Sequence, residues 1–320
     1  MHVQAQDLVK TYPAGVRALD GLSVTIKPGE VFGLLGPNGA GKSTTIKILT
    51  TLARPDSGTA SVAGHDVLRN PERVRRAIGV VAQRSGADPM ATGRENIVLQ
   101  GRLYGMGGGT LRRRVTELID RFDLADAANR PVRTYSGGMQ RRLDVAIGLV
   151  HRPQVLFLDE PTAGLDPEAR SALWQEIGRL SAGEGLTILL TTHYLEEADR
   201  LADRLAIVDK GRIVVEGTPD GLKGELRGDA VHVELRNGPD EAAVREAIGR
   251  VPGVREVAVD GRQLSTRVDD GAAAVPGVLA ALDQAGIPVA AVTVARPSLD
   301  DVYLRHVGHR YTDANSGGTP

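Results

Sequence analysis

The sequence of 320 residues contains no cysteine, no surplus of charge of either sign and no long apolar run. The absence of cysteine excludes disulfide bonds and thiolate metal sites, as expected for a protein of a reducing compartment. Basic and acidic residues nearly balance, at 39 against 40, whereas nucleic-acid-binding proteins usually carry a basic surplus. We therefore expect no nucleic acid as a partner.

Two further absences concern membranes. No apolar stretch approaches the roughly 20 residues that a membrane-spanning helix needs. The first residues also lack the basic and then apolar layout of a signal peptide. We expect a soluble chain, and any membrane role would depend on a separate partner.

The most informative feature that is present is a glycine-rich run with the pattern G-x-x-x-x-G-K-[ST]. Apolar residues 31–35 precede it as a predicted strand, and residues 42–53 follow it with the spacing of a helix. In such a turn, backbone N–H groups and the start of the helix favour phosphate oxygens. We expect Lys42 to reach the β- and γ-phosphates and Ser43 to ligate Mg²⁺. The run consists of Gly36, Pro37, Asn38, Gly39, Ala40, Gly41, Lys42, Ser43 and Thr44.

The apolar patterns predict a β-rich start followed by a doubly wound α/β core. Alternating residues within 3–30 indicate strands of an N-terminal sheet. Continuous apolar runs at 78–82, 155–158 and 187–190 are typical of parallel strands that are buried on both faces. Residues 91–150 interrupt this order with consecutive helices, which predicts a helical insertion.

The pattern changes after a hinge-like stretch at residues 217–228. The order β-α-β-β-α-β that follows predicts a small ferredoxin-like α+β domain. A last helix is expected over residues 298–307, capped by Ser298. The predicted domains are residues 1–220 and 224–310, and the tail at 311–320 is expected to be disordered.

Asp159 and Glu160 end the apolar strand at 155–158. A carboxylate at this place, like Asp159, holds the Mg²⁺ shell in P-loop NTPases. Glu160 would then lie near the γ-phosphate and polarise a water molecule. The alternative is a strand that merely meets solvent at an acidic turn.

Ser136, Gly137 and Gly138 precede another predicted helix. A serine at this position usually only caps the helix. The glycines would also let a ligand approach the backbone closely. Because the chain already has one phosphate loop, this helix end is expected to serve the nucleotide of a neighbouring subunit.

Gln83 and His193 each follow a predicted parallel strand, where α/β sheets place ligand contacts. A lone histidine is more often structural than catalytic. Tyr12 follows an N-terminal strand, and packing is the simplest interpretation of that residue taken alone.

Taken together, these motifs resemble those of the ATP-binding subunits of ABC transporters, over roughly residues 1–220. The resemblance implies an α/β fold with a P-loop NTPase core, an N-terminal antiparallel β subdomain and a helical insertion. The matches are, in chain order, Tyr12 (adenine stacking), residues 36–44 (Walker A), Gln83 (Q-loop), residues 135–140 (signature), residues 155–160 (Walker B), Asp166 (D-loop) and His193 (switch histidine).

The signature departs from the common Leu-Ser-Gly-Gly-Gln, because Tyr135 replaces the leucine and Met139 occupies the place of the glutamine. The serine and glycines are kept, so nucleotide contact is expected to survive. The ending at residues 297–304, after a small α+β domain, is similar to that of the daunorubicin-resistance type of subunit.

The resemblance implies a homodimer in which each ATP lies between the Walker A loop of one chain and the signature of the other. It implies Glu160 as general base, with His193 and Lys42 stabilising charge, and Mg²⁺ held by Ser43, Gln83 and Asp159. It also implies a separate multi-span membrane permease, which would hold the chain at the cytoplasmic face of the membrane. The transported molecule would be a drug-like compound that is exported.

Other interpretations stay open. A non-transport ABC ATPase is disfavoured because the chain has one ATPase half, no zinc-binding cysteines and no long coiled coil. The ATP-binding subunit of an importer, or of an exporter of a lipid or polysaccharide, would have much the same sequence.

Overall fold

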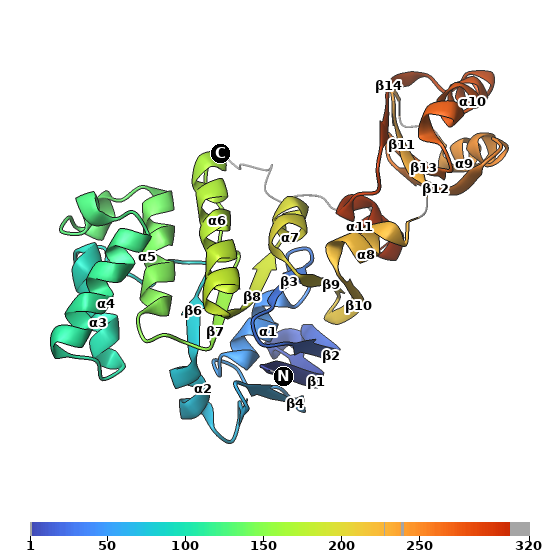
Figure 1. Ribbon diagram of the computed structural model, residues 1–320. Helices are drawn as coiled ribbons and strands as arrows, with labels where there is room; N and C mark the ends of the chain where they lie inside the picture. Colours follow the sequence, from blue (N-terminus) through green and yellow to red (C-terminus); the bar gives the residue numbers. More distant parts are fainter. Residues whose placement is uncertain (1, 227, 238–239, 308–320) are drawn as a thin grey trace. The chain divides into compact units, whose positions relative to one another are not determined.

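The computed structural model describes residues 2–226, 228–237 and 240–307. The chain divides into two compact units, with the boundary between Glu216 and Gly217. Each unit is described by itself (Figure 1).

The centre of unit 1 is a six-stranded sheet in the order β10-β9-β3-β8-β7-β6. The strands from β9 to β6 are parallel, and all residues of β3 and β8 are buried, as their apolar sequences predict. The bounds are β3 (Val31–Leu35), β6 (Ile78–Val81), β7 (Val155–Asp159), β8 (Thr187–Thr192), β9 (Arg204–Asp209) and β10 (Arg212–Gly217).

A second, antiparallel sheet of unit 1 has the order β2-β1-β4-β5. The sequence did not indicate β4, because its residues are small and it contains a glycine. Gly58 lies against β1, and a Cβ there would come within 2.4 Å of the Asp7 carbonyl oxygen. The bounds are β1 (Val3–Thr11), β2 (Arg17–Ile26), β4 (Ser57–Val62) and β5 (His65–Asp66), with a 3₁₀ turn η1 (Pro13–Gly15) between β1 and β2.

The predicted helical insertion is present, and Figure 1 shows α3, α4 and α5 gathered on one side of unit 1. Their apolar faces share one core cluster with β7 and β8. The insertion comprises α3 (Gly93–Leu103), α4 (Gly108–Arg121), η2 (Ala125–Ala127), η3 (Val132–Thr134) and α5 (Gly137–Leu149).

The remaining helices of unit 1 lie between the strands of the sheet in the chain order. The helix after the glycine-rich loop is shorter than predicted: it ends at Leu49, and Thr51 then adopts a positive φ of 66°. These helices are α1 (Lys42–Leu49), α2 (Pro71–Ala77), α6 (Pro167–Glu184) and α7 (Leu195–Leu201).

Unit 2 contains an antiparallel sheet in the order β12-β13-β11-β14, with the connectivity of a ferredoxin-like fold. Its core gathers the apolar residues of β11, β13, α9 and α10. The elements are β11 (Asp229–Leu235), α9 (Glu241–Gly249), β12 (Val254–Asp260), β13 (Gln263–Val268), α10 (Gly271–Gln284), β14 (Val289–Ala295) and α11 (Leu299–Val307).

The stretch that the sequence indicated as hinge-like, residues 217–228, contains a helix that the sequence did not reveal. A short helix, α8 (Pro219–Gly224), begins at Thr218, whose hydroxyl accepts a hydrogen bond from the Gly221 N–H at 3.0 Å. The threonine cap and the proline at the first helical position are ordinary signals for a helix start. The tail expected at 311–320 lies outside the described residues.

Candidate functional site

The glycine-rich loop joins β3 to α1, as the sequence predicts. Two of its glycines are required by the fold. Gly41 has φ of 112°, and a Cβ on Gly36 would come within 2.3 Å of the Val208 carbonyl oxygen. The loop is therefore pressed against β9, with its backbone at the start of a helix where anions are favoured.

Lys42 is buried at the first position of α1. Its ammonium donates to the carbonyl oxygens of Gly36 at 2.6 Å and Pro37 at 3.1 Å, and lies 3.6 Å from a carboxylate oxygen of Glu160. Burial lowers the pKa of the Lys42 ammonium, and the charge of Glu160 opposes that effect. The lysine thus lies between the loop and the end of β7.

Asp159 is the last residue of β7, and one of its carboxylate oxygens accepts two hydrogen bonds. Ser43 donates at 3.1 Å and Thr191, from β8, donates at 2.7 Å. Ser43 and Asp159 are 116 positions apart in the chain and meet because β3 and β7 end at the same edge of the sheet. Their hard oxygen atoms are of the kind that Mg²⁺ binds.

Glu160 lies at the centre of the site and is nearly buried. Gln83 donates to it at 3.1 Å, and Nδ1 of His193 lies 3.3 Å from the same carboxylate oxygen. The neighbouring imidazole of His193 is the main cause that lowers the pKa of Glu160, burial opposes it, and the charge of Lys42 adds to the lowering. The carboxylate is thereby kept ionised.

The backbone of Glu160 adopts a left-handed φ of 48°, which is uncommon for a residue with a side chain. Its N–H donates to both the hydroxyl and the carbonyl oxygen of Thr191. This unusual backbone conformation turns the chain directly after the strand.

Arg141 is a member of the site that the sequence did not reveal. It projects from α5, is buried, and donates to the carbonyl oxygens of Ala82, Asp159, Glu160 and Pro161 at 2.5 to 3.1 Å. Burial lowers the pKa of its guanidinium group. The arginine therefore joins the turn after β7 to the end of β6 just before Gln83.

A pocket of about 260 Å³ lies over the glycine-rich loop. Tyr12 forms part of its wall, as an adenine-stacking residue would, and Glu160 also lines it. The lining residues are Tyr12, Val16, Ala18, Pro37, Asn38, Gly39, Gly41, Lys42, Ser43, Thr44 and Glu160.

Four of the predicted site residues do not lie at this pocket: Ser136, Gly137, Gly138 and Asp166. Ser136 caps α5 by accepting a hydrogen bond from the Met139 N–H, and Asp166 caps α6 by accepting one from the Ala169 N–H. Ser136, Gly137 and Asp166 are exposed. Gly138 has a packing reason to be glycine, because a Cβ there would come within 2.8 Å of the Ala169 side chain.

The two departures from the common signature are explained by packing. Tyr135 is buried, and its hydroxyl donates to the Ala127 carbonyl oxygen at 2.7 Å. Met139 packs against the core of the helical insertion. Gly93 makes room for the tyrosine, since a Cβ there would meet the Tyr135 hydroxyl at 2.3 Å.

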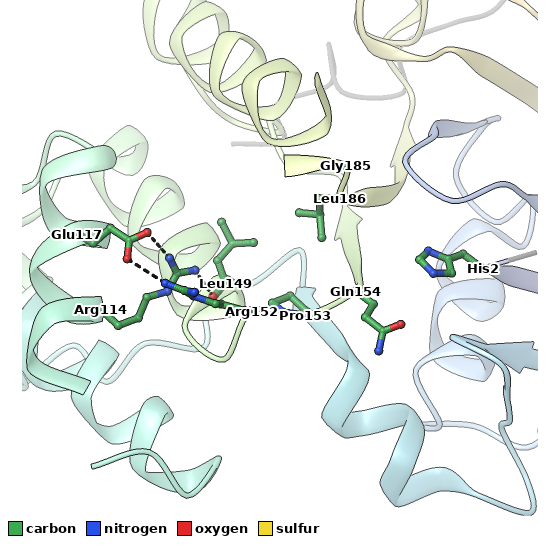
Figure 2. Close-up of a pocket in the computed structure, with 9 residues that line it drawn as sticks. All are labelled: His2, Arg114, Glu117, Leu149, Arg152, Pro153, Gln154, Gly185 and Leu186. Carbon is green, nitrogen blue, oxygen red and sulfur yellow. Dashed lines mark hydrogen bonds and ion pairs between the residues drawn. The ribbon is translucent and has the colours of Figure 1, made fainter. Parts of the chain in front are cut away.

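A different pocket of about 560 Å³ opens at the other end of the same sheet (Figure 2). Gln154 and Leu186, which line it, directly precede β7 and β8, whereas the glycine-rich loop follows a parallel strand. Arg114 and Arg152 both reach Glu117 there. The single carboxylate of Glu117 offsets only part of the positive charge of the two arginines, and none of the predicted site residues lies here.

In the ranges that the structure describes, no helix is both long and apolar enough to span a bilayer.

Two family models match the chain. The model described as ABC transporter matches residues 19–163, and the model described as ATP-binding protein DrrA1-3-like, C-terminal domain, matches residues 217–307. Together they cover parts of both units.

Similar proteins agree with these models. A daunorubicin resistance ATP-binding protein, DrrA3, of Streptomyces coeruleorubidus is 50% identical over 91% of this chain and 92% of its own length. A Nod factor export ATP-binding protein of Burkholderia orbicola is 41% identical over 92% of this chain and 93% of its own. A solved dimeric ATP-binding cassette with ADP and Pi bound is 28% identical, with a TM-score of 0.63 over 68% of this chain and 98% of its own.

Proposed function

Because the chain belongs to the ATP-binding subunits of ABC transporters, of the daunorubicin-resistance type, we propose that its ATPase activity powers the efflux of a drug-like compound through a separate membrane permease. The observation that carries the proposal is the arrangement of Lys42, Gln83 and His193 around Glu160, at the edge of the sheet where the glycine-rich loop begins.

In the proposed reaction, Glu160 accepts a proton from the water that attacks the γ-phosphate. The lowered pKa of Glu160 keeps it ionised and ready to do so. Lys42 and His193 stabilise charge on the phosphate oxygens, and Tyr12 stacks on the adenine. The buried position of Lys42 strengthens its attraction for phosphate, since water screens it little.

We propose Ser43, Asp159 and the amide oxygen of Gln83 as protein ligands of Mg²⁺. The hydroxyl of Ser43 and the carboxylate of Asp159 already lie 3.1 Å apart, so one ion could bind both after a small adjustment. A bound Mg²⁺ would supply positive charge to the phosphates.

The exposed Ser136 and Gly137 support a head-to-tail homodimer, in which they would contact the nucleotide on the partner chain's loop. They stand at the start of a 13-residue helix, where the unpaired N–H groups favour a phosphate. Asp166 would lie in the same interface. The dimeric solved relative is in line with this arrangement.

The proposed permease contact is on the outer face of α3. Leu99 and Leu103 lie one turn apart and are 56% and 73% exposed, although both are apolar. A pocket of about 730 Å³ next to Leu103 is lined by Arg75, Arg76 and other residues of α2 and α3. A membrane protein docked there would hold the chain at the cytoplasmic face of the membrane.

The relative that exports Nod factor favours a second candidate, export of a compound other than a drug. Either compound would be bound by the permease, so the ATP site would be the same in both cases. Only a transport measurement distinguishes the two candidates.

The experiment that tests the proposal compares Glu160→Gln with the wild type in purified protein and in cells. We expect Glu160→Gln to bind ATP, to accumulate as the closed dimer and to hydrolyse ATP about 10²–10⁴-fold more slowly. Glu196→Gln, an exposed position on α7, is the control and should keep wild-type activity. Hydrolysis by Glu160→Gln within a few-fold of wild type would exclude Glu160 as the base.

In cells that also express the permease, the wild type should lower daunorubicin accumulation and Glu160→Gln should not. An active ATPase that leaves daunorubicin accumulation unchanged would favour the second candidate.

A further inference from the structure

Strand β14 forms one edge of the sheet in unit 2. Within residues 228–237 and 240–307, it pairs only with β11. Edge strands carry unpaired backbone N–H and C=O groups that can bond to another strand. Natural proteins usually protect such an edge with charged side chains, proline or a bulge.

Strand β14 lacks this protection on its outer side. Its sequence, Val-Ala-Ala-Val-Thr-Val-Ala, contains no charged residue and no proline. Four of its residues are exposed, and Val294 is 40% exposed. The one register irregularity with β11 lies at its start, near Val289, so the rest of the strand is regular.

The opposite edge of the same sheet provides the contrast. Strand β12 carries Arg255, Glu256 and Asp260, and its register with β13 is interrupted between Val254 and Glu256. Like charges would face one another if two copies of β12 paired in certain registers, and the interruption would disturb the pairing. Only one edge of the sheet is thus suited to receive another strand.

We propose that β14 pairs antiparallel with β14 of a second copy of this chain, so that the two small domains form one continuous sheet across the homodimer. This inference rests on the proposed function, because the homodimer supplies the second copy. A pairing that relates identical surfaces is the usual form of a two-fold interface.

The uncharged sequence of β14 makes the strand compatible with itself. If the pair is centred on Val292, Ala291 of one copy lies opposite Thr293 of the other, and Ala290 lies opposite Val294. These pairs combine small and β-branched side chains with no like charges. Arg296, the nearest charged residue, would lie beyond the paired segment.

The first test uses the absence of cysteine from the chain. In the variant Ala291→Cys/Thr293→Cys, the thiol introduced at position 291 of one copy would lie opposite the thiol introduced at position 293 of the other copy. Glu256→Cys/Ala258→Cys places the same pair on the same face of the opposite edge, strand β12. Full-length variants are oxidised without ATP and separated on a denaturing, non-reducing gel.

We expect a disulfide-linked dimer from the β14 variant and little from the β12 variant. No dimer from the β14 variant, or equal amounts from both, would overturn the proposal. Because this readout needs neither ATP nor hydrolysis, it is independent of the Glu160→Gln test, so a failure of either proposal can be recognised separately.

The second test adds charge to the edge. Ala291→Lys/Thr293→Lys should weaken dimer formation without ATP at least tenfold in sedimentation velocity, because lysines would face the partner strand. Ala280→Lys/Gln284→Lys adds the same charge to exposed positions of α10 and should leave the dimer unchanged. Equal dimer formation by both variants would contradict the proposal.

Discussion

At the scale of single residues, the site combines side chains that the sequence indicated with one that it did not. Lys42, Ser43, Asp159 and Glu160 were predictable because each follows a recognisable strand or loop. Arg141 was not, because its partners are backbone carbonyl oxygens from separate parts of the chain. Carbonyl groups leave no trace in a sequence, so such contacts become visible only in three dimensions.

We expect Arg141→Met to lower the free energy of unfolding of unit 1 by about 3 kcal/mol, because buried carbonyl oxygens lose their donors. Hydrolysis should fall as well, because the turn that holds Glu160 is released. Urea unfolding and ATPase rates measure the two effects. Arg142→Ala, at a neighbouring side chain that is 28% exposed, is the control, and an equal loss in both variants would argue against a special role for Arg141.

The pH dependence of hydrolysis should depend on His193. The imidazole of His193, 3.3 Å from the Glu160 carboxylate, lowers the pKa of Glu160, so the ionised base persists to a lower pH and is lost only as the pH falls through that lowered value. In His193→Ala, the pKa of Glu160 should rise, and the acid side of the kcat/KM profile should move to higher pH.

The control for this shift is Tyr194→Phe, which keeps the ring next to His193. Its pH profile should match that of the wild type. An acid limb that stays in place in His193→Ala would show that another group sets the pKa of Glu160.

At the scale of elements, the sequence predicted the strands with continuous apolar runs correctly, but it did not reveal the weakly apolar segments. Strands β3, β7 and β8 are buried on both faces, which leaves a continuous apolar pattern. The sequence did not reveal β4, because small residues and a glycine dominate it. It did not reveal α8, because that helix has only six residues. Their formation depends on packing partners that are distant in the chain.

The last helix, α11, is held by a buried carboxylate. Asp301 lies 3.2 Å from the guanidinium group of Arg267 on β13 and 3.6 Å from Nε2 of His232 on β11. Ser298 also donates to it from its N–H and its hydroxyl, each at 2.9 Å. The expected cap by Ser298 is therefore part of a larger arrangement that fixes the helix to the sheet.

We expect Asp301→Asn to lower the free energy of unfolding of unit 2 by about 3 kcal/mol, because it leaves the buried Arg267 without its counter-charge. Asp300→Asn, at the exposed neighbouring position, should change it by less than about 0.5 kcal/mol. Chemical unfolding of the full chain measures both. A loss as small for Asp301→Asn as for Asp300→Asn would show that the helix is held by its apolar face alone.

At the scale of the whole molecule, each unit has its own hydrophobic core. The nucleotide pocket and all the residues that we assign to ATP lie in unit 1. The sequence indicated this division through the change of pattern near residue 217.

Because no core cluster spans both units, we expect two thermal transitions in calorimetry of the full chain. A non-hydrolysable ATP analogue at 100 times its Kd should stabilise only the transition of unit 1, by about 2.7 kcal/mol. Lys42→Ala, which should lose binding, is the control and should show no shift. An equal shift of both transitions would mean that the units unfold together.

Helix α5 has a consequence for communication within the proposed dimer. Its first turn, with Ser136, would sense the nucleotide of the partner chain, and Arg141 on the same helix holds the catalytic turn of its own chain. Ser136 and Arg141 are separated by about one and a half turns, so the start of this one helix would contact both sites. ATP bound at one site would then change the position of the turn that holds Glu160 at the other site. The rate of hydrolysis should therefore rise with ATP concentration more steeply than two independent sites allow.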